Sequence, residues 1–492
     1  MSRVDELDPE TRDAVESFVS EWLADEHVPG ASVALVDCAE PRSAEDASGE
    51  GRSSSHRSSG QSPREGGDQP RAGDHVVYAD GFGARDLESN APATPDTVFG
   101  VASVTKSFVA TSVLRLVDEG HLSVDDPVTD YVPYFRDLDD PPTVHELLSH
   151  TSGMPSDGAS VALISRFVGG DAATAPLSSD ADVRRNVRDS LAERSDGERF
   201  FYYNTGYTVL GELVEAIDGR PFPEYVDDEV LGPLGMDRSV VRADPGDVAD
   251  GMTPYRLDDG DLEETAFPVK GVGAAGGLLS TASDLAAYLQ FAMHGDERVL
   301  PDDLLDLAQE PHATRQERVD GAANQYGYGW MRQPLLGDEL VEHSGDLAVS
   351  SAYVGFLEDA GVGVAVLANT SPEVHPSFVG RALLALVRGE DPDDAVPFYA
   401  LRAKCRRVAG RYESFRSAMT ADVEATGGTL QATFETALGE ESVTAFPESL
   451  DPTDHRFYTV DAGGNRQPLT FEETDEGLDC YYQRWRLHES DE

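Results

Sequence analysis

The order of apolar and polar residues divides the N-terminal region into one helix and two strands. Apolar residues fall on one side of the segment 8–25, and Pro9 stands near its start, which predicts an amphipathic helix. Strand-like runs follow at 31–37 and 75–86. Residues 39–74 between them are rich in Ser, Gly, Arg and Asp and nearly free of apolar side chains. Such a segment cannot offset its ordering entropy, so we expect a disordered insertion in a hairpin loop.

The rest of the first domain is predicted to be a helical middle, to about residue 300, followed by a meander. Short β-branched and aromatic runs with turn residues between them are typical of antiparallel strands. A helix at 377–389 closes the unit. The expected strands lie within 326–334, 339–345, 349–359 and 361–369.

A change in pattern near residue 390 predicts a second domain. Residues 391–399 read as an acidic, proline-containing linker, and residues 400–492 as short strands of a small β-barrel. The pair Gly427-Gly428 fits a two-residue hairpin turn. The predicted class is therefore α+β over residues 1–390, followed by a small all-β barrel domain.

The amino-acid composition adds a large excess of negative charge to this picture. The chain of 492 residues has 92 acidic and 38 basic residues, a net charge of −54, and only three lysines, Lys106, Lys270 and Lys404. Self-repulsion of this size is tolerable where salt screens it, since the Debye length is about 3 Å at molar salt. Acidity with loss of lysine predicts a protein adapted to high salt. It argues against nucleic-acid binding, which needs basic patches.

Targeting signals are not visible in the sequence. The N-terminus has no apolar core of a signal peptide, and no run approaches the roughly 18 apolar residues of a membrane span. The three cysteines, Cys38, Cys405 and Cys480, are unclustered, which fits neither a disulfide framework nor a zinc site. We therefore expect a cytoplasmic protein without a membrane span.

Ser103 and Lys106 are candidate catalytic residues. Ser103 precedes a helical apolar pattern that ends at Gly120, and Lys106 lies one turn after it. This spacing brings the amine beside the hydroxyl, at a helix end whose unpaired N–H groups can stabilise an oxyanion. A lysine in an apolar pocket can act as a base, which arginine cannot. A serine N-cap beside an incidental lysine is the alternative interpretation.

Two later segments could complete the site. Tyr202 and Asn204 precede a second helix; a tyrosine can protonate a leaving group and an amide can bind a substrate carbonyl, although Tyr202 could instead be part of a buried aromatic run. His343 and Gly345 lie on a candidate strand, with Asp346 after them. Glycine lets backbone approach closely, and the Asp346 N–H could be a second oxyanion donor.

The order S-x-x-K, Y-x-N, H-x-G resembles the serine β-lactamase and penicillin-binding-protein superfamily, in its class C and D-aminopeptidase/esterase-like branch. The resemblance covers roughly residues 10–390. The C-terminal strands resemble more loosely the lipocalin-like domain of some archaeal members. The motifs that carry the resemblance are TPDTVFGVASVTK (94–106), TVHELLSHTSGMP (143–155), FFYYNTGYTVLG (200–211), AAGGLLSTASDLAAYL (274–289) and GFLEDAGVGVAVLAN (355–369).

The resemblance implies a β-lactamase/transpeptidase-like fold, an antiparallel sheet flanked by helices beside an all-helical region. It implies an acyl-enzyme formed by Ser103, with Lys106 and Tyr202 exchanging the proton and Asn204 holding the substrate. The Ser103 and Asp346 amides would bind the oxyanion. His343 replaces the lysine usual in β-lactamases and penicillin-binding proteins, so a fixed cation for a substrate carboxylate is missing.

The expected activity is therefore a serine hydrolase acting on an amide or ester, a D-amino-acid peptide or small ester, with no cofactor. The alternatives are β-lactamase or penicillin-binding activity, a non-catalytic binding protein that keeps the fold, and a metallohydrolase. The last lacks support, since no H-E-x-x-H and no tight His/Asp cluster is present. His145 and His150, five residues apart at a candidate helix, are expected to pack or hydrogen-bond locally. The partner is a small-molecule or peptide substrate, and the sequence leaves the oligomeric state open.

Overall fold

The chain folds into two compact units in the computed structural model, which describes residues 7–37, 75–155, 185, 187–195, 199–241, 243–258, 260–267, 273–475 and 477–490. The first unit comprises 1–313, 326–332 and 338–380, and the second 314–325, 333–337 and 381–492. The insertion predicted at 39–74 lies outside the described residues, as do Cys38 and Lys270.

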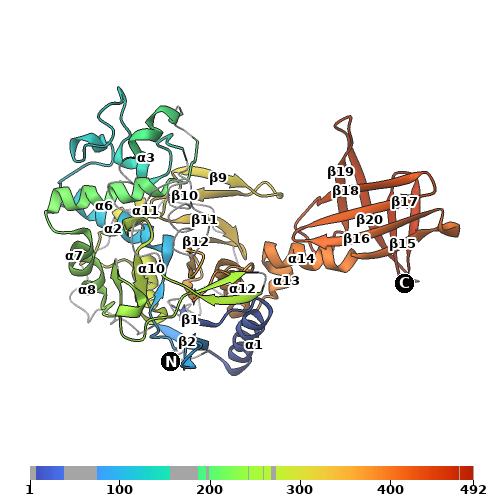
Figure 1. Cartoon of the computed structure of the whole chain (residues 1–492), viewed down its shortest axis with the longest axis horizontal. Helices are drawn as coiled ribbons and strands as arrows, with labels where there is room; N and C mark the ends of the chain where they lie inside the picture. The colour runs from blue at the N-terminus through green and yellow to red at the C-terminus, as the bar shows by residue number, and fades with distance from the viewer. Residues whose placement is uncertain are drawn as a thin grey trace, which may run out of the picture. The chain divides into compact units, whose positions relative to one another are not determined.

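A nine-stranded sheet has the order β3-β2-β1-β14-β13-β12-β11-β10-β9 (Figure 1). β1 lies between β2 and β14 and pairs antiparallel with both, so Ala31 faces Phe82 on one side and Ala368 on the other. The predicted N-terminal hairpin and the later meander are both present. The strands are β1 (Gly30–Asp37), β2 (Val76–Asp86), β3 (Ala91–Pro92), β9 (Ala313–Glu317), β10 (Ala323–Tyr326), β11 (Met331–Leu335), β12 (Asp338–Asp346), β13 (Ser351–Leu357) and β14 (Val362–Ala368).

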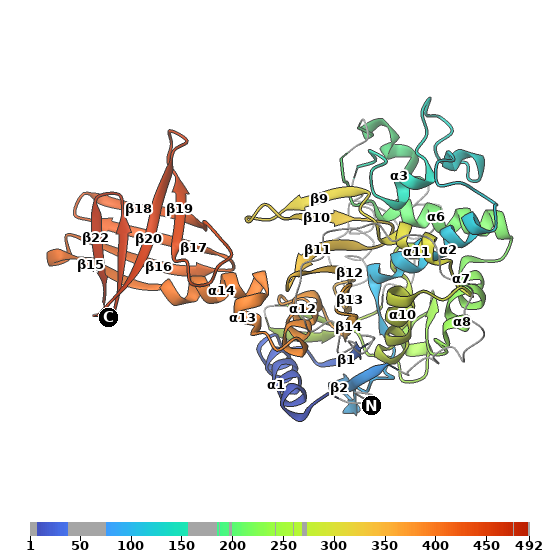
Figure 2. The same ribbon diagram turned by 180° about the vertical axis from the view of Figure 1, so that it is seen from behind.

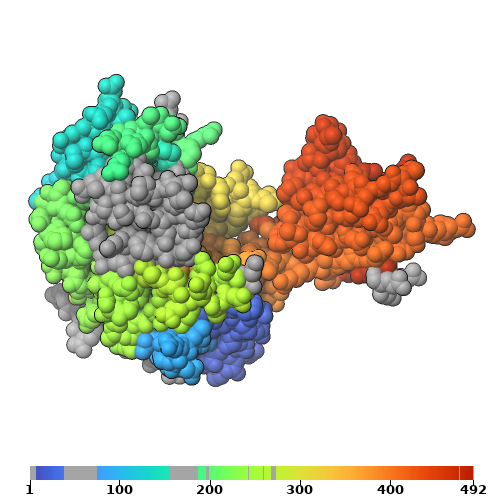
Figure 3. Space-filling model, viewed as in Figure 1, coloured from blue at the N-terminus to red at the C-terminus, as the bar shows by residue number. Residues whose placement is uncertain are grey.

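Helices from both ends of the first unit lie against this sheet. α1 (Pro9–Asp25) begins as predicted after Asp8, whose side chain accepts from the N–H groups of Glu10 and Thr11. α1 lies beside β2, as Figures 2 and 3 show in dark and light blue. α12 (Pro376–Val387) is the helix predicted at 377–389, with slightly different bounds. Its Gly380 lies so close to Tyr353 that a Cβ at this position would approach the ring to 2.2 Å.

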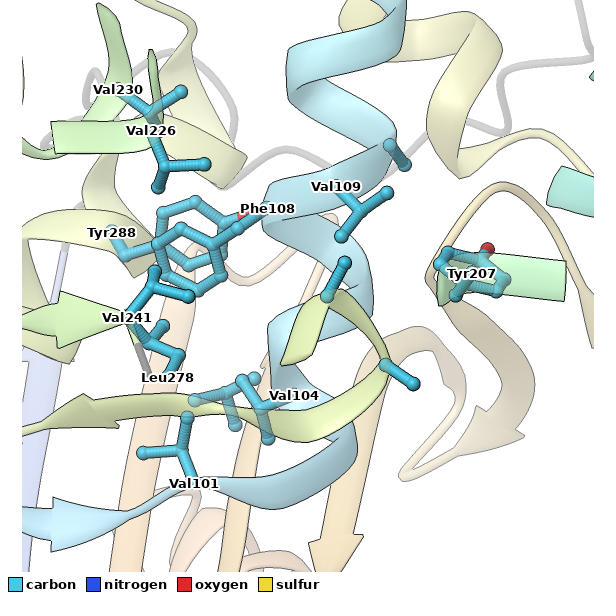
Figure 4. Packing of buried hydrophobic residues seen from close by; sticks show 14 of the residues in the cluster. Val101, Val104, Phe108, Val109, Tyr207, Val226, Val230, Val241, Leu278 and Tyr288 are labelled. Atoms are coloured by element: carbon cyan, nitrogen blue, oxygen red, sulfur yellow. The ribbon is translucent and has the colours of Figure 1, made fainter. Parts of the chain in front are cut away.

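The helical region is built around α2 (Thr105–Asp118), most of whose residues are buried. Phe108 stacks on Tyr288 of α10 with the ring centroids 3.8 Å apart (Figure 4). Each such buried side chain stabilises the fold by about 1.5–3 kcal/mol. The other helices are α3 (Val144–Leu148), α6 (Asn204–Asp218), α7 (Phe222–Val226), α8 (Gly232–Leu234), α9 (Gly273–Gly276), α10 (Ala282–His294) and α11 (Asp302–Gln309).

Short strands and single turns connect these helices. Two small sheets have the orders β4-β8-β5 and β6-β7. None of the helices in the described part of the chain is long and apolar enough to cross a membrane. The short strands are β4 (Phe99–Gly100), β5 (Val240–Val241), β6 (Tyr255–Asp258), β7 (Asp261–Glu264) and β8 (Leu278–Ser280). Short 3₁₀ helices are Ala102–Val104, Val128–Asp130, Leu191–Glu193 and Pro245–Asp247, Asp227–Leu231 is a π-helix, and a further 3₁₀ turn, Phe415–Ser417, lies in the second unit.

The second unit contains the predicted barrel, closed by eight consecutive strands from β15 to β22. The hairpin expected at Gly427-Gly428 joins β16 to β17, and Gly427 has the positive φ of 59° that such a turn needs. Aromatic side chains fill the interior, where Phe434 and Tyr482 stack at 4.2 Å. The strands are β15 (Gly410–Ser414), β16 (Met419–Thr426), β17 (Thr429–Thr436), β18 (Gly439–Pro447), β19 (Arg456–Val460), β20 (Arg466–Thr474), β21 (Gly477–Tyr482) and β22 (Trp485–Glu489).

Two helices stand where sequence analysis expected a linker and strands. α13 (Pro392–Ala395) and α14 (Pro397–Val408) precede the first barrel strand. The expectation of strands alone beyond residue 400 was therefore wrong. α14 packs on β16 and β17, and its Leu401 contacts Gly428. This contact joins residues distant in sequence, so the local pattern did not indicate it.

Candidate active site

Ser103 and Lys106 lie together at the start of α2. Ser103 is part of the turn Ala102–Val104 and partly exposed, whereas Lys106 is completely buried. The Lys106 Nζ lies 2.9 Å from the Ser103 Oγ. Ala102 has a φ of 49°, a left-handed conformation that costs a residue with a side chain roughly 1–2 kcal/mol. Such strain is concentrated at functional sites in proteins.

Two further contacts of the Lys106 amine are with oxygens that can only accept. Nζ lies 2.8 Å from the Asn204 Oδ1 and 2.7 Å from the Ala275 carbonyl oxygen. A neutral amine has two hydrogens and one lone pair. If both hydrogens are donated to these oxygens, the lone pair is directed at the Ser103 hydroxyl, where it can accept a proton.

Ala275 was missed by sequence analysis because its backbone carbonyl, not its side chain, contacts Lys106. Its helix α9 packs against α6, where a Cβ on Gly211 would lie 2.4 Å from the Ala274 Cβ. A glycine at 211 therefore lets α9 reach the site. The Ala-Ala-Gly-Gly run at 274–277 gave a family motif but no indication of this hydrogen bond.

Aromatic rings surround the amine. The Lys106 Nζ is 4.9 Å from the ring centroid of Tyr202 and 5.6 Å from that of Tyr207. Tyr202 stands two residues before Asn204, the first residue of α6, so one segment supplies both predicted side chains. Tyr207 donates to the Leu148 carbonyl at 2.6 Å, and burial raises the pKa of its hydroxyl.

His150 lies beneath Tyr202 and was predicted only to pack or hydrogen-bond locally, as was His145. The His150 Nδ1 accepts from the Tyr203 N–H at 3.1 Å, and its ring centroid lies 4.3 Å from that of Tyr202. The His145 Nδ1 contacts the Tyr328 hydroxyl at 2.6 Å. Both histidines therefore support the site walls in the way that sequence analysis expected.

β12 brings Gly345 against the Ser103 turn. A Cβ on Gly345 would lie 2.2 Å from the Val101 carbonyl oxygen and 2.8 Å from the Ser103 nitrogen. Real Cβ atoms do not tolerate such distances from backbone, so only glycine fits. The segment with the H-x-G motif therefore lies against the segment with the S-x-x-K motif.

The Asp346 N–H points away from β13. The Leu347 N–H donates to the Ser350 carbonyl at 2.9 Å, so these two residues form a hydrogen-bonded pair. Asp346 faces Ser351 in the same register, and pairs alternate along an antiparallel ladder. The Asp346 N–H is therefore left out of the β12–β13 ladder, as an oxyanion donor must be.

His343 is buried, with 1% of its surface exposed. Its Nδ1 lies 2.7 Å from the Ser344 carbonyl oxygen, which requires a hydrogen on Nδ1. Its Nε2 lies 3.2 Å from the oxygen of the Tyr326 hydroxyl, within hydrogen-bond distance. Tyr326, which sequence analysis missed, therefore helps to hold the buried His343 ring in place.

Among the residues that the structure describes, no three His, Cys, Asp or Glu side chains are grouped in a way that could hold a metal ion.

Comparison with known proteins decides the family. A model for β-lactamase matches residues 15–388, most of the chain. The chain belongs to the β-lactamase family. Its fold is the β-lactamase/transpeptidase-like fold, followed by a closed eight-stranded barrel. A second model, for the Pab87 octamerisation domain, matches residues 392–488 of this β-lactamase family member.

Among solved structures, the octameric penicillin-binding protein homologue from Pyrococcus abyssi has a TM-score of 0.81 and 33% identity, covering 96% of this chain and 99% of that one. A D-amino acid amidase from Ochrobactrum anthropi SV3 has a TM-score of 0.55 and 22% identity, covering 77% of this chain and 96% of the amidase. At this identity, the second likeness shows the fold alone.

Curated relatives match part of the chain. Protein flp of Staphylococcus aureus strain MW2 is 28% identical over 311 residues, which cover 62% of this chain and 59% of that protein. The chain thus matches less than two thirds of that relative's length. Esterase EstB of Burkholderia gladioli is 31% identical over 338 residues, which cover 61% of this chain and 84% of the esterase.

Proposed function

We propose that this protein is a serine hydrolase that cleaves an amide or ester bond through an acyl-enzyme on Ser103. The observation that carries the proposal is the 2.9 Å contact between the Lys106 Nζ and the Ser103 Oγ; the Asn204 Oδ1 and the Ala275 carbonyl oxygen, which also contact the amine, are acceptors. A neutral Lys106 takes the hydroxyl proton while Oγ attacks the substrate carbonyl carbon.

The remaining steps use the neighbouring groups. The N–H groups of Ser103 and Asp346 stabilise the oxyanion, and Asn204 holds the substrate. Tyr202 gives a proton to the leaving amine or alkoxide as its bond to the carbonyl carbon breaks, and Lys106 returns a proton to Tyr202. Water then hydrolyses the acyl-enzyme and restores Ser103.

The preferred substrate is a D-amino-acid peptide or amide, or a small ester. A buried histidine, His343, stands where β-lactamases and penicillin-binding proteins usually have a lysine, so the fixed cation for the carboxylate of a β-lactam or a peptide C-terminus is missing. The esterase among the similar proteins, at 31% identity, favours the ester part of this class. The net charge of −54 leads us to place the working environment in a cytoplasm of high salt.

A substrate panel in molar KCl tests this proposal. We expect p-nitrophenyl esters or D-aminoacyl amides to be turned over with a kcat/KM at least about tenfold above that for a chromogenic cephalosporin, since one missing charged contact is worth about that factor. The L-aminoacyl amides serve as the matched control for stereochemistry. A dominant rate on the cephalosporin would contradict the proposed substrate class.

We propose further that the barrel unit mediates self-assembly. Support comes from the octamerisation-domain match over 392–488 and from apolar side chains that the barrel exposes, with Phe415 79% and Leu438 99% exposed. Light scattering of the full chain in molar KCl should give a mass of several copies, and the double variant Phe415→Ser/Leu438→Ser a smaller one. Leu87→Ser, on the first unit, is the control. A monomeric wild-type chain would contradict assembly.

A further inference from the structure

The peptide between Gly345 and Asp346 is held from the sheet face opposite Ser103. The His375 Nε2 lies 3.1 Å from the Gly345 carbonyl oxygen. His375 directly precedes α12, and its Nδ1 accepts from the Ser377 N–H at 3.1 Å. A ring nitrogen that accepts a hydrogen bond carries no hydrogen, so in the neutral ring the hydrogen is on Nε2. His375 therefore donates to the Gly345 carbonyl as a second donor, beside the Ala352 N–H, since Gly345 and Ala352 form the hydrogen-bonded pair of the ladder next to Asp346 and Ser351.

The Asp346 side chain is fixed on the same face. Its Oδ1 accepts from the Ala348 N–H at 2.6 Å, and its Oδ2 accepts from the Ser371 hydroxyl. The same Oδ2 is 4.0 Å from the His375 Nε2. Ala348 has a φ of 64°, so the chain turns sharply just after the peptide. Side-chain contacts thus fix both residues of this peptide.

The planarity of the peptide links these contacts to the site. In a trans peptide, the carbonyl oxygen and the following N–H point in opposite directions within one plane. A donor that fixes the Gly345 oxygen therefore also fixes the direction of the Asp346 N–H. A hydrogen bond to the oxygen also polarises the amide and strengthens the N–H as a donor.

We propose that His375 is a positioning residue for the oxyanion site, which orients and polarises the Gly345–Asp346 peptide so that the Asp346 N–H stabilises the transition state. The proposal rests on the proposed hydrolase function. His375 does not touch the substrate. Because the oxyanion exists only in the transition state, loss of this contact lowers kcat and leaves KM nearly unchanged.

Two amide variants separate the roles of the two ring nitrogens of His375. His375→Asn can still accept from the Ser377 N–H and cap α12, since asparagine is a favoured N-cap, but its side chain is too short to reach the Gly345 oxygen. His375→Gln can place its amide nitrogen where Nε2 stands. His121→Asn, at a side chain that is 55% exposed, is the matched control.

The experiment measures kcat and KM on the best ester or amide substrate, and the inhibition constant of a boronic acid whose tetrahedral adduct mimics the oxyanion. In His375→Asn we expect kcat to fall about five- to tenfold, the worth of one hydrogen bond, with KM within about twofold. The boronic acid should bind more weakly by a similar factor. His375→Gln should recover most of both losses, and His121→Asn should match the wild type.

Three outcomes would overturn the inference: an unchanged kcat in His375→Asn, a loss confined to KM, or an equal loss in the asparagine and glutamine variants. Thermal unfolding of each variant accompanies the kinetics, and if the asparagine variant does not fold, a glutamine variant with less than half the wild-type kcat counts against the proposal. Absence of turnover in the wild type would instead contradict the proposed hydrolase function.

Discussion

Replacing Ser103 by alanine is expected to lower kcat/KM by at least about 10⁴-fold on any ester or amide that the wild type hydrolyses. The alanine variant lacks the Ser103 hydroxyl, which contacts the Lys106 amine and can lose a proton, whereas the Asn204 and Ala275 carbonyls in contact with the same amine cannot. Steady-state hydrolysis in molar KCl measures the loss.

The matched control is Ser112→Ala, in the same helix. The Ser112 Oγ donates to the Phe108 carbonyl at 2.8 Å and is buried away from the amine. This variant should keep kcat/KM within a few-fold of the wild type. Retention of more than about one hundredth of the activity in Ser103→Ala would mean that another group is the nucleophile.

Lys106 variants are expected to have the second largest effect. Lys106→Met removes the base and should lower kcat by about 10²–10⁴-fold, the usual worth of a general base. Lys106→Arg keeps a positive charge but cannot be deprotonated in the working pH range. It should lose a similar factor at every pH.

The two lysine variants distinguish proton transfer from fixed charge. Full activity in Lys106→Arg would show that the side chain acts only as a cation, which would contradict the proposed base. Because Lys106 is completely buried, circular dichroism and thermal unfolding must first show that each variant folds. Kinetics are compared only among folded variants.

Much of the fold could be predicted because its signals are local. β1 and β14 have buried apolar residues along almost their full length, and α1 has a Pro at its start after a capping Asp8. Strands β18 and β20 have little local signal, because most of their residues are polar and exposed, with only a few facing the barrel interior. Closure of the barrel, not local pattern, defines them.

The candidate site likewise contains some residues that the sequence indicates and others that it does not. Side chains at fixed spacing, such as Ser103 and Lys106, are visible in a sequence, and the structure brings their atoms into contact. The Ala275 carbonyl carries no side-chain signal, and His375 contacts Gly345 across a separation of 30 residues. The burial of His343 also depends on distant residues such as Tyr326. Tertiary contacts of this kind have no sequence periodicity.

The most direct test of the central claim is covalent labelling. The folded chain is treated with a fluorophosphonate in molar KCl, and the adduct is located by mass spectrometry of its peptides. The account predicts one adduct per chain, on Ser103, which is absent in Ser103→Ala and strongly slowed in Lys106→Met. An adduct on another residue, or no adduct on folded wild-type protein, would contradict it.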